Sequence, residues 1–235
     1  MTANSQNLIS ALRHGLIVSC QAPVDSPLHD PLVMAAMAQA SVNQGAVGVR
    51  IDTPAHIQAV RKQCPTTPII GLWKQQIAGS EVYITPQFDH AQAIALAGAD
   101  IIALDATLRQ RPGGETLSEL IPRIHAELEK PVMADIDTIE NAIAAVNAGA
   151  DVVGTTLYGY TASTQHLQPP GFELLSQIVE QLGVPTICEG GIASPQMAQQ
   201  ALQLGADAVV VGTAITGIDW QVQAYQKAMR DGYKL

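Results

Sequence analysis

The sequence predicts a (β/α)8 barrel, the TIM-barrel architecture, and three observations carry this prediction. Eight apolar runs of strand length alternate along the chain with segments of helical periodicity. The runs are nearly continuous in apolar residues, as is typical of parallel strands covered on both faces. A short element that ends in Gly-Ala-Asp precedes three of the runs. Because α/β barrels reach this length as one unit, we expect one barrel domain over residues 1–235.

The expected strands follow directly from the apolar runs. They occupy residues 16–21, 46–51, 68–74, 99–106, 131–136, 150–156, 184–191 and 206–214. Residues 30–45 and 195–205 are examples of the helical segments between them, each with a proline near its start. Residues 79–86, GSEVYITP, form an extra extended piece after the third strand. A doubly wound open sheet is the alternative, and the lack of GxGxxG after the first strand disfavours it.

The Gly-Ala-Asp repeat marks where helices stop and strands start. It occurs as AGAD at 97–100 and 148–151 and as LGAD at 204–207. Each glycine falls where a helix needs a left-handed residue to end, and each aspartate opens the next strand. The repeat therefore sets the boundaries of three of the eight units.

Composition narrows the partners and the compartment. The net charge of −9 argues against nucleic acid or a membrane surface as a partner, since both attract basic patches. The three cysteines are an odd number without CxxC spacing, which indicates reduced thiols. The first residues are too polar for a signal peptide, and no apolar run is long enough to span a membrane. We expect a soluble cytoplasmic protein.

Chemistry in such a barrel is expected at the carboxyl ends of the strands. The polar residues there are Gln21, Arg50, Lys74, Asp105, Asp135, Asp137, Thr155, Thr156, Glu189 and Thr213. Some of these side chains can simply cap the following helix or form ion pairs. The D-x-x-E pattern at Asp137 favours a capping box.

Asp105 also has a structural interpretation, because two arginines follow it closely. We favour an ion-pair network at the rim, formed with Arg109 and Arg111, over a role in substrate binding.

Lys74 and Glu189 are the candidate proton-transfer groups. Lys74 directly follows the apolar run PIIGLW, which would hold its amine still and dry. In a pocket beside other cations an ammonium loses proton affinity, so it can become a base or an amine nucleophile near neutral pH. Glu189 ends the seventh strand. An acid and a base on different strands can work on two sides of one substrate carbon.

Small residues after the last two strands predict a phosphate site. Gly190 and Gly191 follow Glu189, and Gly212 and Thr213 follow the eighth strand. Loops after strands seven and eight form the usual phosphate site of this fold, with backbone amides and a helix N-terminus as donors. Such a site lets an acidic protein hold an anion without a basic surface.

These residues, taken together, resemble the N-acetylmannosamine-6-phosphate 2-epimerases. The similarity runs from about residue 8 to residue 230, through SCQA, GVRI, IIGLWK, IIALDAT, R-x-RP, VMADIDT, GTTLYGYT, CEGGI and VVVGTAIT. It implies a phosphate-binding TIM barrel of sialic acid and amino-sugar breakdown. Such enzymes interconvert N-acetylmannosamine 6-phosphate and N-acetylglucosamine 6-phosphate without a metal or organic cofactor.

The resemblance also implies roles for individual residues. Lys74 and Glu189 fall on the acid–base positions of the family, and Gln21, Arg50 and Asp135 fall on positions that hold the sugar. The four phosphate-loop residues named above match its phosphate loops. One position departs from the pattern: an arginine and a proline usually follow AIT, whereas this chain has Gly217 and Ile218. A modified substrate, weaker phosphate binding, or another cation such as Arg50 would each accommodate this change.

The expected reaction is inversion at C2 of the open-chain sugar, and three alternatives stay open beside it. A Schiff-base aldolase would use Lys74 as a nucleophile. A metal-dependent epimerase would need converging histidines, but the six histidines lie outside the strand ends without ligand spacing. A phosphosugar-binding module would keep only the phosphate loops. We expect a homodimer, as is common for barrels of this kind.

Overall fold

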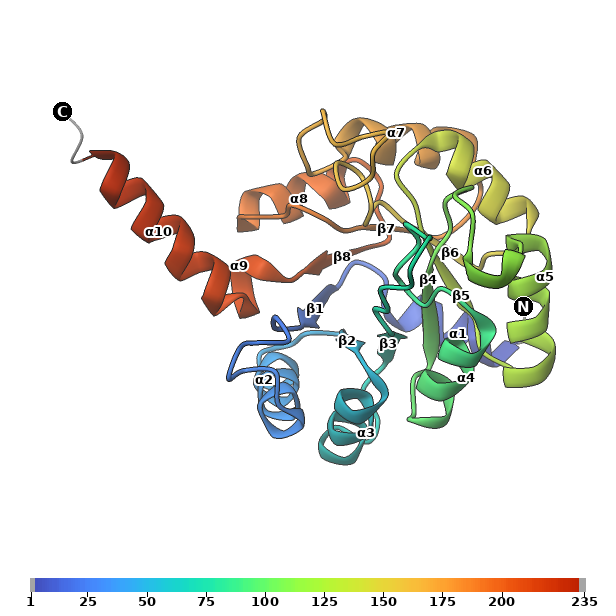
Figure 1. The fold of residues 1–235 in the computed structure, drawn as a ribbon, viewed down its shortest axis with the longest axis horizontal. Coiled ribbons are helices and arrows are strands. Elements are labelled where there is room, and N and C mark those ends of the chain that lie inside the picture. Colours follow the sequence, from blue (N-terminus) through green and yellow to red (C-terminus); the bar gives the residue numbers. More distant parts are fainter. Residues whose placement is uncertain (1–2, 233–235) are drawn as a thin grey trace.

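Eight parallel strands close into a barrel in chain order, as seen in the computed structural model, which describes residues 3–232 (Figure 1). The strands are β1 Leu16–Cys20, β2 Gly48–Asp52, β3 Ile69–Leu72, β4 Ile101–Asp105, β5 Val132–Asp135, β6 Val152–Gly154, β7 Thr186–Cys188 and β8 Ala208–Val211. The pairing of β1 with β8 closes the sheet, with Ile17 opposite Val210. The barrel is confirmed and the open-sheet alternative is wrong; every predicted run overlaps one strand, and β2 extends one residue beyond its run.

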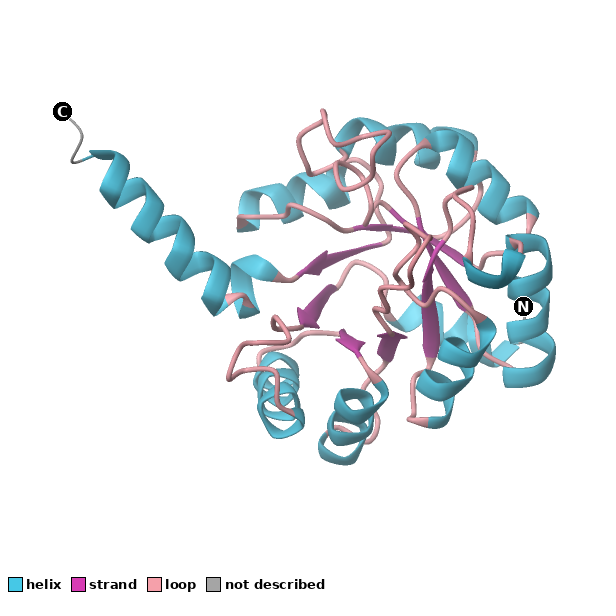
Figure 2. Ribbon diagram, in the orientation of Figure 1, coloured by secondary structure: helices cyan, strands magenta, loops and turns pink. Residues whose placement is uncertain are grey.

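Most of the helices form a ring around the outside of the barrel (Figure 2). The longer ones are α1 Ala3–Ala11, α2 Pro31–Asn43, α3 Pro54–Gln63, α4 Phe88–Leu96, α5 Leu117–Arg123, α6 Ile139–Asn147, α7 Phe172–Gln181, α8 Pro195–Gln203 and α10 Ile218–Gly232. Shorter turns are η1 Pro112–Gly114, η2 Ile124–Leu128 and α9 Thr213–Thr216. Asp30 and Ser194 cap α2 and α8 with their side chains, and proline follows each cap, as expected.

The Gly-Ala-Asp repeat joins neighbouring strands. Its three glycines have positive φ values between 97° and 108°, which lets each helix end in a left-handed residue. Each aspartate lies at the start of a strand, and its carboxylate accepts the backbone N–H that opens the preceding strand. These bonds run from Ile69 to Asp100, Val132 to Asp151 and Thr186 to Asp207, at 2.9, 2.7 and 2.8 Å.

The core has an inner and an outer layer, because successive strand residues point to opposite faces. Ile17 and Val210 belong to the cluster that fills the barrel. Their chain neighbours Val18 and Val209 pack outward, against α2 and α8 respectively. All four side chains are almost completely buried. This packing holds the strand ends, and the side chains that follow them, in fixed positions.

Two segments depart from the regular pattern. Residues 73–87 cross the barrel mouth between β3 and α4, held by an antiparallel bridge between Lys74 and Ile84. The third strand therefore ends at Leu72, two residues earlier than predicted. At the other end of the chain, α10 projects away from the barrel (Figure 1). Among residues 3–232, no helix is long and apolar enough to cross a membrane.

Candidate active site

A cavity of about 460 Å³ opens at the carboxyl ends of the strands. Eight of the nine predicted site residues line it: Gln21, Arg50, Lys74, Glu189, Gly190, Gly191, Gly212 and Thr213. They come from the ends of β1, β2, β3, β7 and β8. The barrel therefore brings together residues that lie up to nearly two hundred positions apart in the sequence. The ninth predicted residue, Asp135, lies deeper.

A buried ion-pair network forms one wall of this cavity. The Arg50 guanidinium donates Nη1 and Nη2 to the two carboxylate oxygens of Asp135, at 3.1 and 2.6 Å. Its Nη1 also lies 3.0 Å from Oε2 of Glu189. Arg50 is 1% exposed and Asp135 is fully buried. One cation thus holds two carboxylates, a bidentate geometry that fixes all three side chains.

Asp135 acts on the cavity through its partners. Thr156 donates its hydroxyl to Oδ1 of Asp135 at 2.6 Å. The Thr156 hydroxyl oxygen also lies 3.2 Å from Oε2 of Glu189. Thr156 lines the cavity, whereas the Asp135 carboxylate lies beneath Arg50 and Thr156. Asp135 therefore holds Arg50 and Thr156, two side chains that line the cavity.

Glu189 is held as a weak acid. Its side chain is almost fully buried, and burial raises its pKa to about 7. Arg50 opposes this rise, while the negative charge of Asp135 adds to it. The backbone is fixed as well, because Thr155 Oγ1 accepts the Glu189 N–H at 3.0 Å and donates to its carbonyl at 2.8 Å. A carboxyl group with a pKa near 7 can either donate or accept a proton at neutral pH.

Lys74 lines the same cavity but, unlike Glu189, is an exposed residue. Its Nζ donates to Oε1 of Gln21 at 2.5 Å, and its backbone N–H donates to Oδ1 of Asp52 at 3.0 Å. The residue as a whole is exposed, so the strand alone does not enclose the amine. The strand ends before Lys74, and the side chain lies along the open mouth. Desolvation by the surrounding loops still lowers the pKa of Lys74, with Asp52 opposing the shift.

Close packing against neighbouring segments requires glycine at two positions of the glycine loops. Gly191 has a φ of 72°, and a Cβ there would lie 2.4 Å from Cβ of Pro169 in the neighbouring loop. Only glycine fits this position. Gly217 is also sterically required, because its Cβ would lie 2.8 Å from Cα of Thr213. The arginine that the family resemblance leads us to expect at this position would therefore need a different turn.

Sequence reasoning missed several residues of the cavity wall. They are Ser19, Tyr83, Tyr160, Trp220 and Gln221. Tyr83 lies in the extra extended piece, and burial raises its pKa to about 12. Trp220 and Gln221 lie in the first turn of α10, and Gln221 donates to the Thr213 carbonyl at 3.2 Å. The extended piece was a usable signal for Tyr83; no motif pointed to the two α10 residues.

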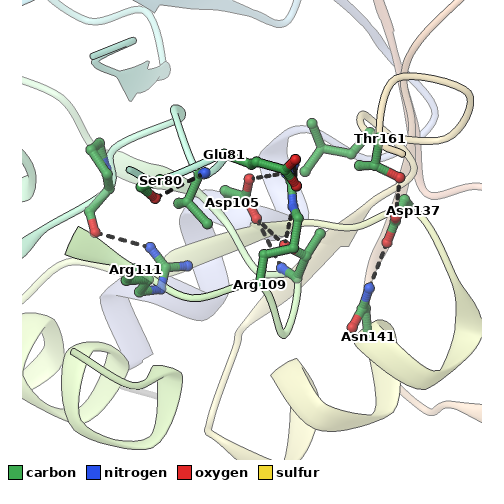
Figure 3. Close-up of polar contacts among 12 residues, drawn as sticks. Ser80, Glu81, Asp105, Arg109, Arg111, Asp137, Asn141 and Thr161 are labelled. Atoms are coloured by element: carbon green, nitrogen blue, oxygen red, sulfur yellow. Dashed lines mark hydrogen bonds and ion pairs between the residues drawn. The ribbon is translucent and has the colours of Figure 1, made fainter. Parts of the chain in front are cut away.

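The expected rim network is present around Asp105 (Figure 3). Arg109 Nη2 lies 2.6 Å from Oδ2 of Asp105, and its Nη1 lies 3.9 Å from Glu81. Arg111 instead donates to the Pro86 carbonyl at 3.2 Å. The prediction is confirmed for Arg109, whereas Arg111 anchors the loop backbone.

The predicted capping box at Asp137 is wrong. Thr138 is the N-cap of α6, and its side chain accepts the Asn141 N–H. Asp137 is buried one residue earlier, where it accepts hydrogen bonds from Asn141 Nδ2 at 2.6 Å and Thr161 Oγ1 at 2.5 Å (Figure 3). The helix begins one residue late because the threonine hydroxyl caps it, which frees the carboxylate to tie the β6–α7 loop to α6.

Histidines do not converge on the site. His29 and His56 stack edge to face with ring centroids 4.6 Å apart, but neither lines the cavity. Within residues 3–232, no group of three or more His, Cys, Asp or Glu side chains is arranged to hold a metal ion.

Comparison with known proteins identifies the family. The family model described as "Putative N-acetylmannosamine-6-phosphate epimerase" matches residues 34–231. Proteins named "Putative N-acetylmannosamine-6-phosphate 2-epimerase" are 66% identical over 224 residues in Thermosynechococcus vestitus and 62% identical over 225 residues in Synechococcus elongatus. Each alignment covers 95% of this chain and 97% of the relative.

A solved structure agrees with these relatives. The N-acetylmannosamine-6-phosphate 2-epimerase from Clostridium perfringens superposes with a TM-score of 0.90 at 38% identity, and the match covers 94% of this chain and 96% of that one. Sequence and fold thus match over almost the whole length of both proteins. This chain belongs to the N-acetylmannosamine-6-phosphate 2-epimerase family.

Proposed function

We propose that this enzyme interconverts N-acetylmannosamine 6-phosphate and N-acetylglucosamine 6-phosphate by moving the proton at C2. The observation that carries the proposal is an amine and a carboxyl group, Lys74 and Glu189, on the walls of one cavity beside two glycine loops. The names of the family and of its relatives support epimerisation over the aldolase alternative. The reaction belongs to the breakdown of sialic acids and amino sugars.

The chemistry begins from the open-chain sugar, whose C1 carbonyl acidifies the proton at C2. One group removes that proton, an enolate forms with its charge on the C1 oxygen, and a proton returns to C2 on the opposite face. We assign Lys74 to one face. Glu189 serves the other face or transfers the proton that opens the ring. Burial moves the pKa of each group toward neutrality, raising that of the acid and lowering that of the amine, which suits both for proton transfer.

Arg50 and Gln21 are the groups that we assign to the developing oxyanion. Arg50 is a permanent cation at the cavity wall, and Gln21 carries an amide beside Lys74. Fixed donors at the site of developing charge stabilise a transition state more than water does. Asp135 keeps Arg50 in place through their bidentate pair.

The phosphate group fits the loops after β7 and β8. Gly190 and Gly191 provide backbone amides on one side, and Gly212 and Thr213 provide them on the other. With glycine at position 217, we assign phosphate binding to backbone donors rather than to an arginine.

Turnover of the two sugar phosphates tests this proposal. The enzyme is incubated with N-acetylmannosamine 6-phosphate, and proton NMR follows the appearance of the second epimer. Conversion in both directions supports the proposal. Binding by calorimetry without conversion would instead identify a phosphosugar-binding module.

Borohydride trapping separates the aldolase alternative. A lysine that forms an imine with its substrate is converted by borohydride to a stable secondary amine. We expect no mass increase on Lys74 after treatment with substrate and borohydride. A substrate-dependent adduct on this residue would favour the lyase.

A cytoplasmic location and the absence of a nucleic-acid partner are part of the proposal. The net charge of −9 disfavours nucleic acid, and the three cysteines are free thiols, as expected in a reducing compartment. A sugar phosphate is then the small-molecule partner of the site.

We also propose that the enzyme is a homodimer that uses the exposed face of α10. Ile218, Val222, Tyr225 and Met229 are 54%, 54%, 71% and 59% exposed, and their spacing places them on one stripe of the helix. The helix has no buried side chain and projects from the barrel. Because an isolated helix of this length is marginal in water, a second copy is the occupant that we assign to this apolar stripe.

Light scattering after size exclusion tests the dimer. The double variant Val222→Glu/Tyr225→Glu puts two charges on the apolar stripe and should give monomers. A matched control, Gln223→Glu/Lys227→Gln, makes the same change in net charge on the other side of the helix and should stay dimeric. A monomeric wild type, or a stripe variant that remains dimeric, would overturn the assignment.

A further inference from the structure

The side chain that contacts Lys74 from β2 has no role in the scheme above. Asp52 is the last residue of β2, two positions after Arg50. Residues two apart on a strand point to the same face, so Asp52 follows Arg50 along the barrel interior toward its mouth. There it meets the residue that we assign to proton transfer.

The Asp52 side chain continues the contact between the second and third strands beyond the point where β3 ends. The last β2–β3 pair joins Asp52 and Leu72, and the Leu72 carbonyl accepts the Thr53 N–H at 3.0 Å. Beyond this pair, the Asp52 carboxylate accepts the Lys74 N–H at 3.0 Å. On its other side, Lys74 bridges Ile84. The backbone of Lys74 is therefore fixed on both sides. One side is the charged side chain of Asp52, and the other is the bridge to Ile84.

The same carboxylate is the main negative charge that acts on the Lys74 ammonium. Desolvation lowers the pKa of Lys74, and Asp52 gives the largest opposing effect. The other charges that act on Lys74 are those of Arg50, Glu189 and Asp135. In their network, one cation is bound directly to two carboxylates, whereas the Asp52 carboxylate accepts the backbone N–H of Lys74.

The surroundings of Asp52 have opposing effects on its charged form. Burial raises its pKa, while Lys74 and His56 lower it. His56 lies on the first turn of α3 against His29, and Asp30 also acts on it. Lys74 is therefore the principal cation facing Asp52.

We propose that Asp52 is a positioning residue for Lys74: its carboxylate fixes the Lys74 backbone by a hydrogen bond and supplies negative charge to the surroundings of the ammonium. This inference rests on the proton-transfer role proposed for Lys74. It adds a residue outside the set that binds the sugar phosphate.

Two substitutions separate the hydrogen bond from the charge. Asp52→Asn keeps a side-chain oxygen that can accept the Lys74 N–H, but it removes the negative charge. Asp52→Ala removes both. Losing the charge destabilises the ammonium, so the Lys74 limb of the pH profile of kcat/KM should move to lower pH by about one unit, whether Lys74 acts as base or acid. The Ala variant should show this shift and a further fall in kcat of roughly tenfold.

Glu81→Gln is the matched control. It removes one carboxylate from the rim, in the Asp105–Arg109 network, whereas the hydrogen bonds of Lys74 go to Asp52 and Gln21. Its pH profile should match that of the wild type. In all variants the limb near pH 7, assigned to Glu189, should keep its position. Thermal unfolding checks that the Asn variant, which has the same shape as aspartate, stays folded.

The outcomes are distinct from those that test the proposed function. An Asp52→Asn enzyme with an unshifted pH profile overturns the positioning role, provided that Lys74→Ala is inactive. If Lys74→Ala keeps wild-type turnover, then the proton-transfer role itself fails and the inference falls with it. A shift in Asp52→Asn that also occurs in Glu81→Gln would mean a general charge effect, and this too overturns the proposal.

Discussion

Glu189 and Lys74 share one cavity but are held in contrasting ways. Glu189 is 8% exposed and is tied by its side chain to Arg50 and Thr156. Lys74 is exposed and has one side-chain partner, Gln21. The protein surroundings partly desolvate both groups, even though Lys74 as a whole residue is exposed, and this raises the pKa of the acid and lowers that of the amine. The contrast teaches that one physical effect, desolvation, can prepare both partners of a proton transfer.

The largest effect is expected at the buried partner. Glu189→Gln keeps the shape of the side chain and removes its proton chemistry, so kcat should fall by a factor of about 10²–10⁴. Turnover measured at pH 7 with saturating substrate checks this. The control Glu81→Gln changes an exposed carboxylate at the rim and should keep kcat within about threefold. Equal activities in the two variants would remove Glu189 from the reaction.

The buried network should also carry stability that the Lys74 side does not. Asp135→Asn leaves the Arg50 guanidinium buried with part of its charge uncompensated, and we expect a loss of about 3–5 kcal/mol in the free energy of unfolding. Urea unfolding measures it. Asp89→Asn, on the exposed first turn of α4, should change stability by less than about 0.5 kcal/mol. A loss below about 1 kcal/mol at Asp135 would contradict a tightly coupled pair.

The raised pKa of Glu189 predicts a pH-dependent stability of definite sign. Its pKa in the folded protein is about 7, above the ordinary value of 4.5, so the folded state favours the protonated carboxyl. Its contribution to stability is full below pH 4.5 and is lost as the pH rises through 7. Glu189→Gln mimics the neutral form. The free energy of unfolding of the variant minus that of the wild type should therefore increase by roughly 1–3 kcal/mol as the pH rises from 4.5 to 7.

Urea unfolding at pH 5 and pH 8 measures this difference directly. A difference between variant and wild type that is the same at both pH values would mean that Glu189 titrates normally in the folded protein.

The smallest effect is expected at Gln21, the side-chain partner of Lys74. Gln21→Ala removes the acceptor that orients the Lys74 ammonium, and kcat should fall by roughly tenfold, the value of one charge-assisted hydrogen bond. Thermal stability should change little, because Lys74 is exposed. Gln199→Ala, exposed on α8, is the control. A fall in kcat as large as that in Glu189→Gln would show that Lys74 is held as rigidly as Glu189.

Local patterns in the sequence predicted the barrel because short stretches of residues determine where its strands lie and where its helices end. Apolar runs gave the strands, and the Gly-Ala-Asp repeat marked helix ends at Gly98, Gly149 and Gly205. Strand bounds were less accurate: β3 stops at Leu72 because residues 73–87 turn across the barrel mouth. Such a turn depends on contacts between distant segments, which no local pattern contains.

The candidate site was predictable where its residues end strands. Lys74 and Glu189 stand out because a charge follows an apolar run. Asp52 was missed, although it also ends a strand, because the predicted strand stopped at residue 51. Trp220 and Gln221 reach the cavity through the position of α10, and only the folded chain reveals this. Asp137 was misread because the threonine after it competes for the cap.

Exchange of the C2 proton with solvent tests the central claim most directly. Each epimer is incubated separately in D2O with wild-type enzyme and with Lys74→Ala, and NMR follows deuterium at C2. The wild type should exchange both epimers. Lys74→Ala should still bind the sugar phosphates, yet its exchange with at least one epimer should fall by a factor of about 10²–10⁴. Exchange at wild-type rates with both epimers would contradict the assignment of Lys74 as a proton-transfer group.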